Sequence, residues 1–206
     1  MKEYQNLEES SRIGFLNKQR KNLFHRKFYS EARKSLLKLF QRRDIITNMI
    51  NEKVLLFLKE KGYADRLTEH KETIDTVEHA AQQIGCSEAE IAKTLSFIVE
   101  GKPVIVVMAG DGRVNSSKFK ALFHTKPSMI QREQVEAITG FAPGGVCPFN
   151  VPKEIPVWLD VSMKRFEYVH PAGGNSYTSV KLTPAELEEV TNAAGWCDVC
   201  KGWEQE

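Results

Sequence analysis

Two apolar runs separated by a short turn constrain the fold of this chain more than any other feature. Residues 93–99 (KTLSFIV) and 104–109 (VIVVMA) are rich in Ile, Val and Phe, which favour β-strands. The turn between them, GKP, is too short for a crossover connection between parallel strands, which needs a dozen or more residues. The two runs are therefore predicted to pair as an antiparallel hairpin.

Helices are predicted where a capping residue precedes a short amphipathic stretch and a glycine follows it. Thr76 and Asn115 are typical N-caps, and Gly85 and Gly140 are typical stops. Ser87 with Glu90 three residues later forms a capping-box signature. The predicted helices span residues 30–61, 76–85, 87–92, 115–123, 131–139 and 184–195, the last with proline at its start and Gly195 at its end.

Shorter strands are predicted around the hairpin, at residues 66–70, 157–160, 166–170 and 177–182. The chain has no regular alternation of strands and helices and no internal repeat. These patterns indicate an α+β fold, with a mixed or antiparallel sheet and short helices around it.

The charge is unevenly distributed along the 206 residues. Residues 1–45 carry 12 Lys/Arg against 5 Asp/Glu, whereas the remainder carries 17 against 22. We expect residues 1–48 to be a basic, partly helical N-terminal extension and residues 49–206 to be the main domain, because Met49 opens a segment that would itself make a good protein start. The basic segment could add salt-dependent affinity for tRNA, or it could simply be a solvated extension.

Several functional classes are not indicated. The sequence contains no GxSxG elbow, no P-loop and no GxGxxG after a strand. Its apolar runs are short and its N-terminus lacks a signal-peptide core, so a cytoplasmic protein is expected. Cys197 and Cys200 form a single CxxC pair without a second pair or a nearby histidine, so neither a zinc nor a redox site is favoured and no metal is predicted.

Three stretches could carry chemistry, although each has an ordinary structural explanation when taken alone. Lys93 in IAKTL lies at the start of the first apolar run, where lysine stems often cover apolar surface. GGVCP, residues 144–148, could present successive backbone N–H groups to an anion or an oxyanion, or could be a plain turn. AGGNSYTSVKL, residues 172–182, is a second glycine-rich turn that leads into a strand.

Taken together and in order, the stretches IAKTL, VIVVMAGDGRVN, GGVCP and HPAGGNSYTSVKL resemble the YbaK-type aminoacyl-tRNA editing family, the prolyl-tRNA-synthetase-associated editing domain. The similarity covers most of residues 49–201. The resemblance implies a compact α+β fold with a mixed, barrel-like β-sheet flanked by short helices. It also implies hydrolysis of mischarged aminoacyl-tRNA, with tRNA-Pro carrying Cys, Ala or Ser as the expected substrate, by a proofreading deacylase that acts in trans.

The resemblance carries over to individual residues of this chain. Lys93 matches the family lysine of the KTL motif, and residues 144–148 match its GxxxP loop. The implied catalytic residues are Lys93, Gly144 and Gly145, and the implied substrate-binding residues are Val146, Cys147, Pro148, Gly173, Gly174 and Ser179. No cofactor is implied. The partner would be the 3′ CCA end of aminoacyl-tRNA, and a prolyl-tRNA synthetase is left open as a second one.

Some questions stay open at this level. Cys147 stands where relatives often have serine, so a small side chain that packs the loop is favoured over a covalent nucleophile. A non-catalytic tRNA- or synthetase-binding module with the same fold, or a hydrolase for a small-molecule ester, would also fit. The sequence does not tell which amino acid is removed, which tRNA carries it, or what the oligomeric state is.

Overall fold

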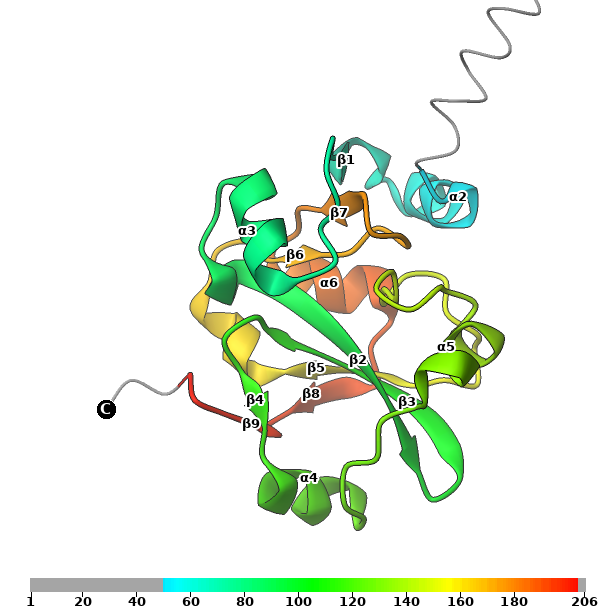
Figure 1. Ribbon diagram of the computed structural model, residues 1–206, viewed down its shortest axis with the longest axis vertical. Helices are drawn as coiled ribbons and strands as arrows, with labels where there is room; N and C mark the ends of the chain where they lie inside the picture. The colour runs from blue at the N-terminus through cyan, green and yellow to red at the C-terminus, as the bar shows by residue number, and fades with distance from the viewer. Residues whose placement is uncertain (1–49, 204–206) are drawn as a thin grey trace, which may run out of the picture. The chain divides into compact units, whose positions relative to one another are not determined.

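The computed structural model describes residues 50–203, which form an α+β domain around a five-stranded mixed sheet (Figure 1). The sheet contains β2 (Ile91–Val99), β3 (Lys102–Ala109), β5 (Val157–Asp160), β6 (His170–Pro171) and β8 (Gly195–Cys197), in the order β6-β2-β3-β5-β8. The β2–β3 pair is antiparallel and the other three neighbouring pairs are parallel. The predicted α+β class and the mixed sheet are confirmed.

The predicted N-terminal extension, residues 1–48, lies outside the described residues, as does the part of the predicted helix before residue 50. The division into an extension and a main domain therefore stays a prediction. Between residues 50 and 203 no helix is both long and apolar enough to cross a lipid bilayer.

The central hairpin forms as predicted, but its turn is tighter. Glu100 and Gly101 both have positive φ, 49° and 78°, as a two-residue type I′ turn requires. Lys102 and Pro103, which the sequence analysis placed in the turn, already belong to β3 and lie opposite Val99 and Ile98. The prolyl residue is accommodated because this position makes no ladder hydrogen bond to β2.

The local capping signals located the helices well. The five described α-helices are α2 (Glu52–Lys61), α3 (Val77–Ile84), α4 (Ser116–Phe123), α5 (Arg132–Thr139) and α6 (Pro184–Thr191). Thr76 and Asn115 cap α3 and α4 through their side chains, and Gly62, Gly85 and Gly140 end α2, α3 and α5 in the left-handed conformation.

Two helix predictions need correction. The capping box of Ser87 and Glu90 is present, but it opens a single 3-10 turn, Glu88–Glu90, because β2 begins at the next residue. Helix α6 ends at Asn192, with φ 48°, rather than at Gly195. Gly195 instead begins β8, where it packs against the ring of Trp158.

The predicted short strands are partly right. Strand β5 has the predicted bounds, and β1 (Leu67–Glu69) pairs with β7 (Thr178–Val180) inside the predicted ranges. Most of residues 166–170 are not in a strand, because the chain leaves a 3-10 turn, Val161–Arg165, and joins the sheet only at His170. The two-residue strands β4 (Arg113–Val114) and β9 (Cys200–Lys201) were not predicted.

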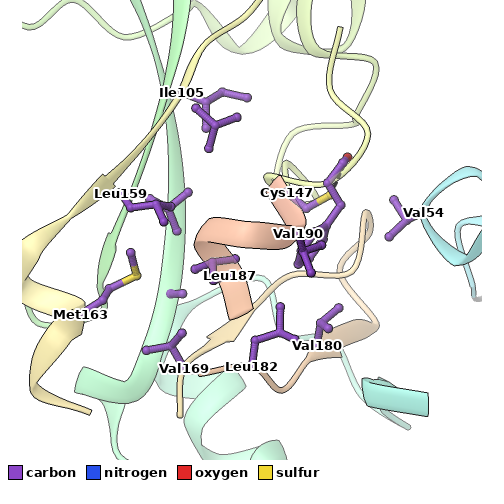
Figure 2. Packing of buried hydrophobic residues seen from close by; sticks show 14 of the residues in the cluster. Val54, Ile105, Cys147, Leu159, Met163, Val169, Val180, Leu182, Leu187 and Val190 are labelled. Carbon is purple, nitrogen blue, oxygen red and sulfur yellow. Dashed lines mark hydrogen bonds between the residues drawn. The ribbon is translucent and has the colours of Figure 1, made fainter. Parts of the chain in front are cut away.

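Apolar side chains fill both faces of the sheet. One cluster joins the sheet to α2 and α6 through residues such as Val54, Leu187 and Val190 (Figure 2). The other joins β3 to α4 through Phe119 and Phe123. Residues 142–148, which contain the GGVCP stretch, form the glycine-proline loop. This loop belongs to the first cluster, since Cys147 lies among the buried side chains of that cluster in Figure 2.

Asp160 is fully buried at the end of β5 and joins two segments. Its carboxylate accepts hydrogen bonds from the N–H of Ser162, at 3.0 Å, and from the N–H of Val199, at 2.8 Å.

We expect Asp160→Ala to lower the free energy of unfolding by roughly 2–4 kcal/mol, because two buried N–H groups lose their acceptor. Urea denaturation measures this. Asp160→Asn keeps one oxygen acceptor and should cost less; equal losses would contradict the explanation.

Candidate active site

A cavity of about 500 Å³ opens beside the outer edge of β2, the edge that does not face β3. Its volume is within the usual range for small-ligand sites. Its walls come from five parts of the chain: the start of α3, strand β2, the segment that leads into α5 with the start of that helix, the glycine-proline loop, and residues 170–172 around β6. The lining residues with polar side chains are Asp75, Thr76, Lys93, Thr94, Ser96, Arg132 and His170.

The glycine-proline loop begins with a tight turn. The N–H of Gly145 donates to the carbonyl oxygen of Ala142 at 2.9 Å, Pro143 occupies the second position and Gly144 the third, with φ 90°. This is the arrangement of a type II turn, in which the third position needs a residue that tolerates positive φ. The N–H of Gly145 is therefore used inside the loop.

The remaining N–H groups of the loop have no acceptor in the described part of the chain. This holds for Gly144, Val146 and Cys147. Gly144 is exposed and Val146 half-buried, and both line the cavity. The loop can therefore offer backbone donors to a ligand, although from a different set of residues than the continuous run of N–H groups that the sequence suggested.

Cys147 and Pro148 are buried and do not line the cavity. The Cys147 thiol lies 3.6 Å from the carbonyl oxygen of Phe149, and burial raises its pKa to about 12. At neutral pH the sulfur is therefore a protonated thiol, which is a poor nucleophile. This geometry agrees with a packing role for the side chain.

Lys93 also lines the cavity, but its ammonium group is held elsewhere. It donates to the carbonyl oxygens of Gly110, at 2.9 Å, and Gly112. Lys93 pairs with Met108, and paired residues share a face of the sheet. Met108 contacts Cys200 in the second cluster, whereas Val146 packs on the first. The ammonium group and the glycine-proline loop therefore lie on opposite faces of β2.

Burial lowers the pKa of Lys93, an effect that the charge of Asp111 partly opposes. Two of the three ammonium protons are used by the two carbonyl groups, which tie the turn after β3 to β2. To contact a substrate on the other face, the side chain would have to leave these carbonyl groups.

Of the second glycine-rich turn, residues 172–182, only Ala172 lines this cavity; Gly173, Gly174 and Ser179 do not, contrary to the sequence-based expectation. A Cβ on Gly173 would lie 2.6 Å from Leu67, and one on Gly174 would lie 2.7 Å from Val54. These glycines are required because the turn packs closely against β1 and α2. Ser179 lines a separate cavity of about 380 Å³ and forms a 2.7 Å hydrogen bond with the Nε2 atom of His70.

The second turn nevertheless supports the site, because it determines where the glycine-proline loop lies. A Cβ on Gly145 would lie only 2.7 Å from the Cα atom of Asn175. Asn51 donates to the carbonyl oxygen of Gly174 at 3.1 Å, which connects the turn to the start of α2.

Six polar residues of the cavity were missed as site residues: Asp75, Thr76, Thr94, Ser96, Arg132 and His170. Thr94 and His170 lie inside the motifs that carry the family resemblance, and that position could have drawn attention to them. Asp75 and Arg132 precede or begin helices and carry no local signal of a site.

Cys197 and Cys200 are both buried, and burial is the main cause that raises the pKa of each thiol, for Cys197 to about 12. Within residues 50–203 no group of three or more His, Cys, Asp or Glu side chains is placed to hold a metal ion. Neither thiol lines the cavity beside β2.

Comparison with known proteins gives consistent results. Residues 71–190 match the family model described as an aminoacyl-tRNA editing domain. An uncharacterized Bacillus subtilis protein, YwhH, is 45% identical over 139 residues, which cover 67% of this chain and 88% of that protein. EbsC of Enterococcus faecalis, named as a candidate Cys-tRNA(Pro)/Cys-tRNA(Cys) deacylase, is 26% identical over 57% of this chain and 73% of its own length.

A crystal structure of a candidate trans-editing enzyme for prolyl-tRNA synthetase superposes with a TM-score of 0.67. The two sequences are 28% identical, and the match covers 73% of this chain and 96% of that one.

The close approach of Gly145 to Asn175 predicts different costs for two neighbouring substitutions. Gly145→Ala should lower the free energy of unfolding by about 3 kcal/mol, because the new methyl group meets backbone atoms. Gly144→Ala has open space around it and should cost about 1 kcal/mol, from its positive φ alone. Urea denaturation of both variants checks this, and a Gly145→Ala variant as stable as Gly144→Ala would contradict the packing argument.

Stability should also fall at mildly acidic pH. Burial lowers the pKa of both His70 and His170 below 6.5, so the unfolded chain takes up protons at a higher pH than the folded chain. The free energy of unfolding should therefore decrease as the pH falls from 7.5 through 6.5. Urea titrations at several pH values measure this slope, which should be smaller in the double variant His70→Gln, His170→Gln. An unchanged slope would show that other groups cause it.

Proposed function

The chain belongs to the aminoacyl-tRNA editing domain family, and we propose that it hydrolyses the ester bond of mischarged aminoacyl-tRNA in trans, on tRNA-Pro carrying Cys, Ala or Ser. One observation carries the proposal: the loop that matches the family motif brings backbone N–H groups without protein acceptors to the wall of a ligand-sized cavity. The names of the similar EbsC protein and of the superposed structure point to the same substrate class.

The chemistry needs little more than such donors. An aminoacyl ester is already activated, so placement and stabilisation of charge supply most of what hydrolysis requires. Water adds to the ester carbonyl carbon, and the negative charge that develops on the carbonyl oxygen is stabilised by the N–H groups of Gly144 and Val146. The bond to the ribose oxygen then breaks, and that oxygen takes up the proton that the attacking water gives up. Amino acid and free tRNA are released.

No covalent intermediate is required. The one thiol of the loop, that of Cys147, is buried, is protonated at neutral pH and lies outside the cavity wall. Its contribution is to anchor the loop in the first apolar cluster. We therefore propose water as the nucleophile.

We keep Lys93 as a site residue in this proposal and derive its role from the contacts of its ammonium group. Its ammonium group donates to the carbonyl oxygens of Gly110 and Gly112 and so connects the turn after β3 to β2. Strand β2 is one wall of the cavity. Direct contact with the substrate would require it to exchange one of these carbonyl groups for a substrate oxygen. Loss of Lys93 should therefore affect both stability and turnover.

Selectivity among acyl groups would come from the size of the apolar part of the cavity, formed by Ile130, Val135 and Val146 among others. A single methylene changes binding in such a pocket by only about 1–3 kcal/mol, which is why selection against near-cognate amino acids benefits from a separate hydrolytic step.

The direct test is a deacylation panel with Cys-, Ala-, Ser- and Pro-charged tRNA-Pro and the full chain, counting released amino acid. We expect release of at least one of the three mischarged residues and retention of proline. Lys93→Ala should reduce release, while Lys153→Ala, an exposed lysine outside the cavity, should not. If no mischarged tRNA is hydrolysed but the tRNA binds, the non-catalytic binding module is the better description. Release from small esters as fast as from tRNA would favour a general esterase.

The same assay can isolate the backbone donor at position 146. Val146→Pro removes this N–H group and should lower kcat by roughly 100-fold, with little change in KM, as expected for a donor that acts mainly in the transition state. Val146→Ala keeps the N–H group and shortens the side chain, so it serves as the matched control. Thermal melts establish that both variants fold. Equal kcat values for the two would contradict the proposed role of the loop.

A further inference from the structure

The outer edge of β2 is paired at both ends but not in the middle. At its start, Ile91 and Ala92 pair with β6, and near its end Ser96 and Ile98 bond to residues 128–130. Between these two segments, neither β6 nor residues 128–130 pair with Thr94. The cavity is located here, because its lining includes residues 93–95 together with Ala172, Met129 and Ile130.

Hydrogen bonds at the two ends show which backbone groups face this gap. The N–H of Ile98 donates to the carbonyl oxygen of Ser128 at 2.8 Å, and the carbonyl oxygen of Ser96 accepts from Ile130 at 3.0 Å. In a strand, the N–H and C=O groups of alternate residues point to the same edge. The N–H and C=O groups of Thr94, two residues before Ser96, therefore point to the outer edge as well.

The inner edge agrees with this assignment. Ile98 lies opposite Pro103, which has no N–H to donate, and Ser96 lies opposite Ile105, whose N–H donates to Pro156 on the other side of β3. Thr94 lies opposite Val107, two residues from the Ser96–Ile105 pair, so its backbone N–H and C=O also point away from β3. Among the described residues, Thr94 thus has neither a backbone acceptor nor a backbone donor from the protein.

The side chain of Thr94 also lacks a hydrogen-bond partner in the described part of the protein. Its hydroxyl oxygen is buried. Leaving a buried polar group unpaired costs about 1–3 kcal/mol, so the buried hydroxyl, next to an N–H and a C=O that have no protein partner at the cavity wall, points to a ligand that supplies the partners. Asp75, just before α3, is the acidic residue of the lining; of the two basic ones, Lys93 is bound by carbonyl oxygens and Arg132 lies at the start of α5.

We propose that the carbonyl oxygen of Thr94 accepts a hydrogen bond from the α-ammonium group of the acyl substrate, so that the cavity selects esters of α-amino acids with a free amino group. This inference rests on the proposed function and adds the recognised group to it. The α-amino group is largely protonated near neutral pH and brings donors and a positive charge. The N–H of Thr94 is left for an oxygen of the same acyl group.

The first experiment compares three esters of the same tRNA and acyl chain in the deacylation assay. They are the alanyl ester, its N-acetyl derivative, and the lactyl ester in which a hydroxyl replaces the amino group. A hydrogen bond to a charged group predicts a kcat/KM about 10- to 100-fold lower for both altered esters. The lactyl ester excludes a purely steric explanation, because it is no larger than the alanyl ester. Equal kcat/KM values for all three would overturn the proposal.

The second experiment measures binding without turnover. The probe is 3′-alanylamino-3′-deoxyadenosine, in which a stable amide replaces the ester, and its lactyl counterpart is the control ligand. We expect the carbonyl carbon resonance of Thr94 to shift with the alanyl probe and to shift much less with the lactyl one. The carbonyl carbon of Ser96, whose oxygen already accepts from the N–H of Ile130, is the internal reference.

The two experiments separate this proposal from the proposed function. If none of these esters is hydrolysed, the panel with Cys-, Ala- and Ser-charged tRNA decides on the hydrolase assignment, and the binding experiment alone decides on Thr94. A selective shift at Thr94 then upholds recognition of the amino group, and equal shifts with both probes overturn it. If all esters are hydrolysed at the same rate, the hydrolase stands and the role of Thr94 falls.

Discussion

The antiparallel pairing of β2 with β3 determines where this domain can bind a ligand. Because β3 occupies one edge of β2 from Ala92 to Val99, only the other edge is left for a ligand to pair with this strand. That edge is covered at both ends, by β6 and by residues 128–130, and open at Thr94. The cavity, its unpaired backbone groups and the approach of the glycine-proline loop are all consequences of how these segments meet along one strand.

The glycines of the two loops serve different purposes, although they look alike in the sequence. Gly144 allows the positive φ of a turn, whereas Gly145 allows that turn to touch the backbone of Asn175. Gly173 and Gly174 let the second turn pack on β1 and α2. The loop that reaches the cavity is thus supported by a second turn whose glycines do not, so substitutions in either turn would change the position of the backbone donors.

The site offers a ligand mostly main-chain groups. Two of its ionisable side chains contribute little charge to a ligand: burial lowers the pKa of His170, and the Lys93 ammonium group is bound by two carbonyl oxygens. Preorganised N–H and C=O groups need no change of protonation to act and do not reorganise during the reaction. Such a wall suits a substrate that is already chemically activated and has to be recognised and positioned.

The sequence by itself determined the features that depend on neighbours in the chain. The hairpin, the capped helices and the turn chemistry of Gly144 follow from propensities and hydrogen bonds within a few residues, and the ordered motifs identified the family. Tertiary structure decided the rest. The two-residue strands exist only because distant segments pair. Gly173 and Gly174 pack on β1 and α2 rather than line the cavity, and Ser179 lines a separate one. The direction of the Lys93 side chain and the open edge at Thr94 depend on strand pairing across the sheet, for which a single sequence carries no local signal.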